Sequence, residues 1–423
     1  MTKVAVIGGG ISGMAMAYML HEAGRDVTLY EKAPRIGGHT RTLTVTRDHG
    51  AIPVDTGFIV FNEPNYPHLT ALFRHLGVAV QPSDMSFAIS LFGGTVEWGA
   101  QSLNAVFGQR RNLLSPSFYR LIRDVLRFNA RALQTVEAYP DLTLGELIDR
   151  LRLGARFRRD YLLPMGGAIW SCPPQQMLAF PAVTFVQFFK NHGLLSLSGQ
   201  HQWYTVTGGS QQYVAKLTAP YQHCIRTQCA VTSVTGQQEQ MIVTDSTGTA
   251  ATYDQVVFAC HANETLALLN DAMQAEREIL GAFQYQPNTA YLHSDTGIMP
   301  KRKRCWASWV YHTDRPGDAS ELLEGISVTY WMNRLQSIDD KYPLFVTLNP
   351  SRPIDPTKVI DRHVFEHPVF TAQTLQAQQH LAQIQGQRGS WFCGAYTRYG
   401  FHEDGLLSAV KVAQAMGITI PWR

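Results

Sequence analysis

The feature that most constrains the fold is a glycine pattern, Gly8-x-Gly10-x-x-Gly13, placed between two apolar runs. Residues 3–7 form a short β-branched run, and residues 11–23 have the spacing of a helix that ends before Gly24. A second apolar run ends in the acidic Glu31. Strand, tight turn, helix and strand in this order form one βαβ unit.

The three glycines fit a turn that holds a pyrophosphate. Gly8 permits a tight turn, Gly10 lets backbone amides approach the phosphates, and Gly13 allows the helix to pack closely on the strand. The N-terminus of the helix adds the positive end of its dipole. Glu31 is placed to accept hydrogen bonds from both ribose hydroxyls and would repel a 2′-phosphate. The alternative is a degenerate unit that keeps the fold without binding a nucleotide.

A second glycine pair, Gly37-Gly38, follows Glu31 within the segment 32–42. An extended, phosphate-contacting segment at this point suits a long ligand whose flavin end continues past the pyrophosphate. Simple NAD enzymes have no need of it. We therefore expect the cofactor to be FAD.

The residues from Gly8 to Thr42 resemble the flavoprotein amine oxidase superfamily, which includes monoamine oxidases, protoporphyrinogen oxidase, phytoene desaturases and polyunsaturated fatty acid isomerases. Residues 55–59 resemble its next segment, which runs along the flavin. Residues 203–210 resemble the glycine pair that leads its chain back into the FAD domain, and residues 254–259 resemble its return strand. The resemblance implies that the final helix, near Asp404, points its N-terminus at the N1/O2 edge of the flavin.

Within the superfamily, residues 57–62, 330–336 and 400–405 resemble a bacterial group of predicted NAD/FAD-binding proteins found beside cyclopropane-fatty-acyl synthase-like methyltransferases. One departure concerns Gly394-Ala395, where the superfamily usually has Gly-Asp or Gly-Glu before the last helix. The carboxylate that holds the ribityl chain is therefore missing or is supplied by Glu403 or Asp404.

The resemblance implies an α/β fold, in which a Rossmann-type, glutathione-reductase-like FAD-binding domain carries an inserted α+β substrate domain, as in amine oxidases. The FAD-binding domain is expected to be discontinuous, with residues 1–90, 203–270 and 386–423. The substrate domain then takes residues 91–202 and 271–385, a helical insert plus a mixed sheet.

The resemblance also implies which residues meet the cofactor. The expected FAD contacts are Gly8, Gly10, Ile11, Ser12, Gly13, Glu31, Lys32, Gly37, Gly38, His39, Thr40, Thr56, Gly57, Phe58, Ile59, Val231, Gly394, Ala395, Gly405 and Leu406. The expected catalytic groups are His402, Glu403 and Tyr396, with His39 and Arg398 also beside segments that should touch the ring. His402 with Glu403 could move a proton near neutral pH; a structural histidine at the last helix is the alternative.

Composition excludes several classes of protein. With 45% hydrophobic and 16% charged residues, the chain is neither disordered nor fibrous. A net charge of +3 does not indicate nucleic-acid binding. Six cysteines without a C-x-x-C pair predict neither disulfides nor zinc, and His363-Val-Phe-Glu-His367 is a weak metal pattern, so no metal is expected. The glycines in residues 4–20 argue against a signal peptide or membrane span, which favours the cytoplasm.

Arginines repeat along one predicted helix, at Arg120, Arg123, Arg127 and Arg131, with Leu121, Ile122, Val125 and Leu126 on the other side. Such a basic amphipathic helix can rest on anionic lipid head groups, as a peripheral contact at the inner face of the membrane. The alternative is a solvated helix face against the core. The aromatic-rich stretch 161–197 similarly fits an apolar tunnel or ordinary core packing.

Three functions remain open on this basis. The leading one is an FAD-dependent oxidoreductase that acts on an unsaturated lipid or fatty-acyl substrate, by desaturation or double-bond isomerisation, with hydride transfer at flavin N5. The second is a flavin amine oxidase or dehydrogenase. The third is a non-enzymatic FAD-binding accessory protein. Asn333 and Arg334 are candidates for fixing a substrate head group.

Overall fold

The computed structural model describes residues 1–48, 50–170, 177–195, 201–238, 240–314 and 327–422. The chain divides into two compact units. Unit 1 comprises Met1–Gln81, Val206–Gln286 and Pro368–Arg423, and unit 2 comprises Pro82–Thr205 and Pro287–His367.

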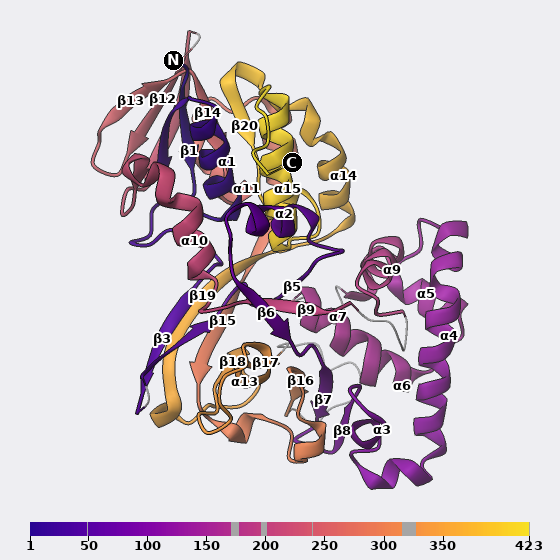
Figure 1. The fold of residues 1–423 in the computed structure, drawn as a ribbon. Helices are drawn as coiled ribbons and strands as arrows, with labels where there is room; N and C mark the ends of the chain where they lie inside the picture. Colours follow the sequence, from indigo (N-terminus) through magenta and orange to yellow (C-terminus); the bar gives the residue numbers. More distant parts are fainter. Residues whose placement is uncertain (49, 171–176, 196–200, 239, 315–326, 423) are drawn as a thin grey trace. The chain divides into compact units, whose positions relative to one another are not determined.

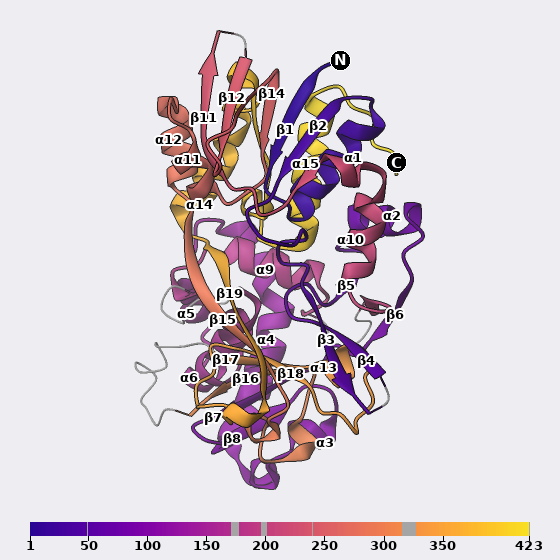
Figure 2. The same cartoon turned by 90° about the vertical axis from the view of Figure 1, so that its left-hand side faces the viewer.

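Unit 1 is built on a parallel sheet of five strands, in the order β10-β2-β1-β14-β20. Its strands are β1 (Lys3–Ile7), β2 (Asp26–Tyr30), β10 (Ile225–Arg226), β14 (Gln255–Phe258) and β20 (Ser390–Phe392). Val4 to Ile7 of the central strand are buried, as expected for a parallel sheet covered on both faces. Helices α1 (Ile11–Glu22) and α15 (His402–Ala415) pack side by side in this unit (Figures 1 and 2).

The remaining elements of unit 1 are short. Helices α2 (Pro67–His75) and α10 (Gln211–Thr218) flank the chain's passages out of and back into the unit. The hairpin β3 (Thr42–Arg47) and β4 (Gly50–Asp55) is antiparallel, as is the sheet of β11 (Val231–Gln237), β12 (Gln240–Asp245) and β13 (Ala250–Tyr253). β5 is Phe61–Asn62.

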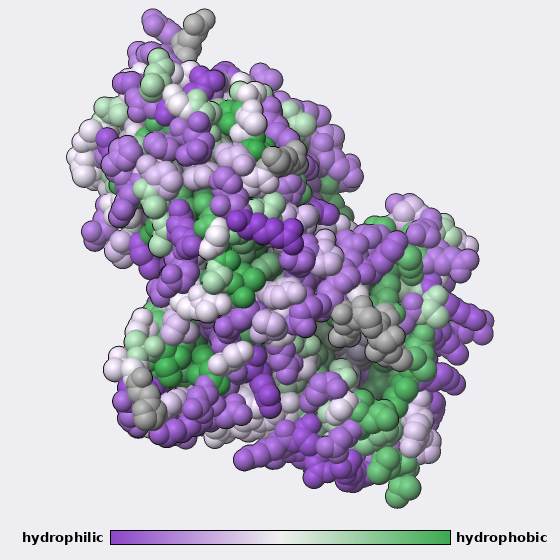
Figure 3. Space-filling model, in the orientation of Figure 1, coloured by the Kyte–Doolittle hydropathy of each residue, from purple (hydrophilic) through white to green (hydrophobic). Residues whose placement is uncertain are grey.

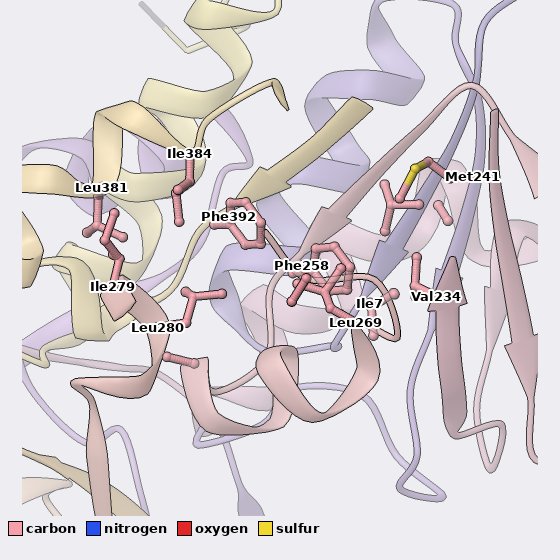
Figure 4. Packing of buried hydrophobic residues seen from close by; sticks show 14 of the residues in the cluster. Ile7, Val234, Met241, Phe258, Leu269, Ile279, Leu280, Leu381, Ile384 and Phe392 are labelled. Carbon is pink, nitrogen blue, oxygen red and sulfur yellow. The ribbon is translucent and has the colours of Figure 1, made fainter. Parts of the chain in front are cut away.

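A hydrophobic core joins the five-stranded sheet and the β11–β13 sheet to three helices of unit 1. These are α11 (Ala262–Leu268), α12 (Gln274–Gly281) and α14 (Ala372–His380). Phe258 and Phe392, on neighbouring strands, stack with ring centroids 5.4 Å apart (Figure 4). Ile279 and Leu280 of α12 lie in the same cluster as Leu381 and Ile384. Unit 1 thus includes residues 271–286 and 368–385, which were expected in the substrate domain. Unit 2 includes residues 82–90 and 203–205, which were expected in the FAD-binding domain.

Unit 2 contains a mixed sheet of seven strands, in the order β19-β15-β18-β17-β16-β7-β8. β16 and β7 pair in parallel. The pairs β7–β8, β15–β18, β16–β17 and β17–β18 are antiparallel. The strands are β7 (Phe87–Leu91), β8 (Val96–Gly99), β15 (Gln284–His293), β16 (Trp309–Thr313), β17 (Ser327–Trp331), β18 (Phe345–Leu348) and β19 (Val359–Val369). Strands β6 (Val80–Ser83) and β9 (Trp203–Val206) connect the units along the chain.

The helical part of unit 2 runs from α3 to α9. Its helices are α3 (Leu103–Val106), η1 (Arg110–Leu114), α4 (Pro116–Ala138), α5 (Leu144–Arg150), α6 (Ala155–Phe157), η2 (Arg158–Leu162), α7 (Leu163–Trp170) and α9 (Ala182–Asn191). The rings of Phe185 and Phe189 stack at 4.3 Å, and Phe128 packs against both Phe189 and Phe157. These aromatic residues of the stretch 161–197 therefore form core; the side chain of Trp170 lies outside the described part. Among the described residues, no helix is long and apolar enough to cross a bilayer.

Candidate active site

The turn between β1 and α1 needs its glycines for different reasons. Gly8 has a φ of +107°, and a Cβ there would lie 2.8 Å from the carbonyl oxygen of Ala259. A Cβ on Gly13 would lie 1.8 Å from the oxygen of Gly8, so the helix can approach the strand only without a side chain. At Gly10, by contrast, no atom lies within 4 Å of the Cβ position. Gly10 is thus not required by the packing of the protein, and it borders open space.

The first turn of α1 faces this space with free donors. Its N-cap residue is Gly10, in an extended conformation, and no side chain of the described residues caps the helix. The first amides of an uncapped helix have no partner within the helix and carry a partial positive charge. The arrangement fits an anionic group such as a pyrophosphate.

The second glycine pair lies against the same turn. The amide of Gly37 donates to the oxygen of Gly9 at 2.8 Å, and a Cβ on Gly38 would lie 3.0 Å from the Cα of Gly10. Both Gly37 and Gly38 have positive φ angles, of +126° and +57°. The two glycine-rich segments that sequence analysis singled out are thus neighbours in space.

Glu31 is nearly buried at the end of β2. Its two carboxylate oxygens accept hydrogen bonds from the amides of Gly9, at 2.8 Å, and Ala33, at 2.7 Å. The side chain therefore also holds the shape of the glycine turn. Lys32 directs its ammonium group to Glu264 of α11 in an exposed ion pair.

Other expected FAD contacts come together through backbone pairing. The amides of Thr56 and Phe58 donate to the oxygens of Arg41 and His39, at 2.8 and 2.9 Å, which places residues 39–41 beside residues 56–58. Ser12 of α1 donates to the oxygen of Gly405 at 2.9 Å. A Cβ on Gly405 would lie 3.0 Å from the Ile11 side chain, so the N-terminal turns of α1 and α15 are in contact. Val231 begins β11 and is half-buried.

A buried aspartate that the site prediction omitted connects two of these segments. Asp55 accepts hydrogen bonds from Thr42 Oγ1 at 2.5 Å and from the Ser210 amide at 2.9 Å and hydroxyl at 2.7 Å. Ser210 is the N-cap residue of α10, so the carboxylate also meets the positive end of that helix. Asp55 thereby fixes the start of the segment Thr56–Ile59. Its proximity to the motif in sequence was a signal, but its partners were not visible there.

His402 lies in a chain of polar contacts. Tyr213 of α10 is fully buried, and its hydroxyl bonds Thr40 Oγ1 and lies 2.7 Å from His402 Nε2. The imidazole stacks on Phe58 with ring centroids 4.0 Å apart. Burial lowers the pKa of His402 to about 3, so the ring is neutral at physiological pH. This burial disfavours the proton transfer near neutral pH that was expected of His402, and a catalytic role of this residue stays a prediction.

Glu403 and Asp404 hold helix ends. The Glu403 carboxylate accepts from the amides of His68 and Leu69, both at 2.9 Å, at the start of α2. Asp404 accepts from the Phe401 amide at 2.9 Å and so caps α15. Burial raises the pKa of Glu403 to about 7 and that of Asp404 to about 6. Both carboxylates therefore stabilise helix ends, and the replacement of the ribityl-binding acid by one of them stays a prediction.

Tyr396 belongs to the core rather than to an open site. It is 2% exposed and packs edge to face against Phe283 at 4.9 Å, within the hydrophobic cluster of unit 1. Its hydroxyl has no hydrogen-bond partner among the described residues, and burial raises its pKa well above the ordinary value. We therefore withdraw Tyr396 as a catalytic group. Nearby, the Gly394 amide donates to Ser408 Oγ at 2.8 Å.

The candidate head-group residues in unit 2 have structural partners. The Asn333 amide nitrogen donates to the oxygens of Asp339 and Tyr342, and its oxygen accepts from the Leu344 amide at 2.8 Å. The Arg334 guanidinium lies over the Trp331 ring at 5.2 Å. Asn333 thus shapes a loop and does not fix a substrate.

Comparison with known proteins decides the family. The model of the flavin-containing amine oxidoreductases matches residues 11–327. The chain belongs to this family. Membership confirms the predicted superfamily, and with it the flavin cofactor. The residues of the glycine turn, the uncapped N-terminus of α1 and Glu31 fit FAD.

The chain matches only part of the length of each of these curated relatives. The flavin-containing amine oxidase B of Bos taurus is 41% identical over 75 residues, which are 18% of this chain and 14% of the relative. A protein of Mycobacterium tuberculosis described as a putative flavin-containing monoamine oxidase is 26% identical over 257 residues, 58% of this chain and 54% of the relative. The matches thus span about half or less of these relatives.

Solved structures share the fold over nearly the whole chain. A fatty acid isomerase from P. acnes that produces CLA has a TM-score of 0.70 at 16% identity, covering 99% of both chains. Cyclohexylamine oxidase from Brevibacterium oxydans has a TM-score of 0.66 at 15% identity, covering 98% of this chain and 99% of the other. The predicted fold class, a Rossmann-type FAD-binding domain with a substrate domain, is confirmed.

The His402 ring should stay neutral between about pH 5 and 8, because burial of the ring disfavours its imidazolium form. Ring-nitrogen NMR of the labelled protein checks this, with His402→Gln to assign the signals. A ring that titrates within that range would contradict the geometry and return His402 to the proton-transfer candidates.

Proposed function

We propose that this protein is an FAD-dependent oxidoreductase that acts on an unsaturated lipid or fatty-acyl substrate, by desaturation or by double-bond isomerisation. The observation that carries the FAD part is the turn at Gly10, where an uncapped helix N-terminus borders open space. The similarity of fold to a fatty acid isomerase and the basic, apolar surface of unit 2 support the lipid part.

The roles proposed for the site residues follow from their contacts. The amides of residues 10–12 bind the pyrophosphate, and Glu31 accepts hydrogen bonds from the ribose while it keeps the Gly9 amide in place. When bound, the flavin supplies the hydride-accepting N5 position. His402, held neutral between Tyr213 and Phe58, orients the segments beside the ring and transfers no proton during the reaction.

The setting proposed for this activity is the cytoplasm, with peripheral contact to the inner face of the membrane through arginines of α4. Arg120, Arg123 and Arg131 are exposed. Arg127 is different, because its guanidinium reaches the oxygens of Leu151 and Arg152, at 3.5 and 3.4 Å. We therefore drop Arg127 from the proposed lipid contacts.

A second candidate function is amine oxidation. The family model and the curated amine oxidases favour it. Anaerobic mixing separates the two: bleaching of the flavin absorption by a monounsaturated phospholipid supports desaturation, and bleaching by a panel of amines supports amine oxidation. If neither bleaches it, a shifted double bond in the recovered lipid supports isomerisation, and its absence contradicts the lipid proposal.

Retention of FAD tests the nucleotide site itself. Glu31→Ala should lower FAD affinity by at least about tenfold, because it removes the ribose acceptor and frees the amides of Gly9 and Ala33. Arg120→Ala, on the exposed face of α4, is the control and should keep its FAD. The measurement is the flavin-to-protein absorbance ratio after gel filtration. Equal retention in both variants would contradict the assignment of this site.

A further inference from the structure

One surface of unit 2 gathers exposed apolar side chains. Eleven large hydrophobic residues are exposed in the described part of the chain, and five of them lie within residues 103–126. We call these five the apolar patch: Leu103, Leu113, Leu114, Tyr119 and Leu126. Leu114 is 89% exposed and Leu103 is 79% exposed, so the side chains protrude into solvent. Single exposed leucines are ordinary, but a cluster of them indicates an interaction surface.

The leucines protrude from a well-anchored turn. η1 ends at Leu114, and the hydroxyl of the next residue, Ser115, accepts from the Phe118 amide and caps α4, which has Pro116 in its first position. The Tyr119 hydroxyl donates to the oxygen of Leu113 at 3.0 Å, and Phe118 is buried on the inner side. An open depression of about 520 Å³ lies here, lined by Leu113, Leu114, Pro116, Tyr119, Arg120 and Arg123. The apolar tips are therefore presented on a rigid support.

The charge around the patch has one sign. Residues 103–131 contain six arginines and one acidic residue, Asp124. Asp124 is buried, where it accepts from the Gly154 amide at 2.9 Å and pairs with Arg123. The exposed Lys303 and Arg304 of η5 (Lys303–Cys305) add positive charge beside the apolar patch, because η5 contacts α3, which carries Leu103. Figure 3 shows hydrophobic surface over the lower end of α4, close to a strongly hydrophilic band.

The pattern of residues in α4 differs from the expectation in one instructive way. Leu126 was expected beside Leu121 on the side of the helix opposite the arginines, but Leu126 is 46% exposed, while Leu121 is buried. The exposed face of α4 therefore mixes leucine with arginine, which a solvated helix face does not require.

We propose that the apolar patch docks on the surface of an anionic phospholipid bilayer. Leu113 and Leu114 enter the boundary between head groups and acyl chains, and Arg120 and Arg123 approach the lipid phosphates. Protruding apolar tips surrounded by cations are the features of a peripheral membrane contact. A second copy of the chain fits less well, because a symmetric pair would bring the arginines of both copies together.

This inference deepens the proposed function, since a docked enzyme meets acyl chains where they are concentrated. Its test does not depend on that function, because vesicle binding is measured without substrate and on protein with or without flavin. The FAD variant Glu31→Ala should bind vesicles like the wild type.

The experiment is co-sedimentation with two kinds of vesicle, pure phosphatidylcholine and phosphatidylcholine containing phosphatidylglycerol. We expect preference for the anionic vesicles, and weaker binding as NaCl is raised. Arg120→Gln with Arg123→Gln should weaken binding about 30-fold, because each arginine near an anionic surface contributes about a fivefold factor. Leu113→Ser with Leu114→Ser should weaken it by at least about tenfold.

Matched controls on the same unit are Ile360→Ser with Val364→Ser, which are exposed on β19 at 38% and 48%. They should bind vesicles like the wild type. Absence of wild-type binding to anionic vesicles would overturn the proposal, as would equal losses in the control. A concentration-dependent dimer that disappears in the Leu113→Ser, Leu114→Ser variant would also overturn it, in favour of contact between copies. Circular dichroism confirms that each variant is folded.

Discussion

Gly13→Ala should destabilise unit 1 severely, whereas Gly10→Ala should leave its stability unchanged and weaken FAD binding. The difference follows from what a Cβ would meet at each position. On Gly13 it would lie 1.8 Å from the oxygen of Gly8, a backbone atom that cannot move without displacing β1 or α1. On Gly10 it meets no atom within 4 Å.

We expect Gly13→Ala to lower the free energy of unfolding by about 3 kcal/mol or more, the upper range for overpacking a tight interior. Gly10→Ala should weaken FAD binding by about tenfold to a hundredfold, because the methyl group occupies space that the phosphates need and separates them from the amides of α1. Urea unfolding of the apoprotein measures the first effect, and flavin fluorescence titration measures the second.

The control for both variants is Gly281→Ala at the end of α12. There the nearest atom to the Cβ position is a Leu266 methyl carbon at 3.7 Å, an ordinary contact distance. This variant should bind FAD normally and unfold like the wild type within about 1 kcal/mol. Normal FAD affinity in Gly10→Ala would show that the pyrophosphate lies elsewhere, and a stable Gly13→Ala would contradict the observed packing of α1 on β1.

The first βαβ unit was predictable because its information is local. Glycine spacing, two apolar runs and a terminal acid determine a turn whose helix and strands follow within a short stretch. The structure places β1, α1 and β2 at Lys3–Ile7, Ile11–Glu22 and Asp26–Tyr30, close to the expected bounds.

The unit boundaries were less predictable because packing decides them. Nothing local in residues 271–286 or 368–385 indicates that α12 and α14 share one cluster through Leu280 and Ala377. In the same way, the helical period of α4 did not reveal that Leu126 is exposed. Which side of a helix is buried depends on its neighbours, and these come from elsewhere in the chain.

The connections within the site were also invisible to local patterns. Tyr213 and His402 stand 189 residues apart in the chain, and their contact depends on α10 and α15 meeting in the fold. The sequence indicated His402 and Glu403 as a reactive pair, because they are adjacent and titratable. Adjacent residues on a helix point in different directions, however, and each found a distant partner. Glu403 bonds the amides of α2 and leaves His402 to Tyr213.

Asp55→Ala should lower the free energy of unfolding of unit 1 by about 3 kcal/mol or more, because Asp55 connects segments that are distant in the chain. The substitution leaves the buried amide and hydroxyl of Ser210, and the half-buried hydroxyl of Thr42, without their acceptor. It also removes the negative charge at the N-terminus of α10. Because Thr56 and Gly57 follow directly, the loss should extend to FAD affinity.

Ser210→Ala separates the carboxylate from its hydroxyl partner. It removes the hydrogen bond from Ser210 Oγ to Asp55 at 2.7 Å and the contact of Ser210 Oγ with Thr42 Oγ1 at 3.3 Å, and keeps the amide donor in place. The expected cost is about 1 kcal/mol, with FAD retained. Urea unfolding and the flavin-to-protein ratio measure both variants. If Asp55→Ala were no less stable than Ser210→Ala, the carboxylate would not fix these segments, and the order of the flavin-side loop would need another source.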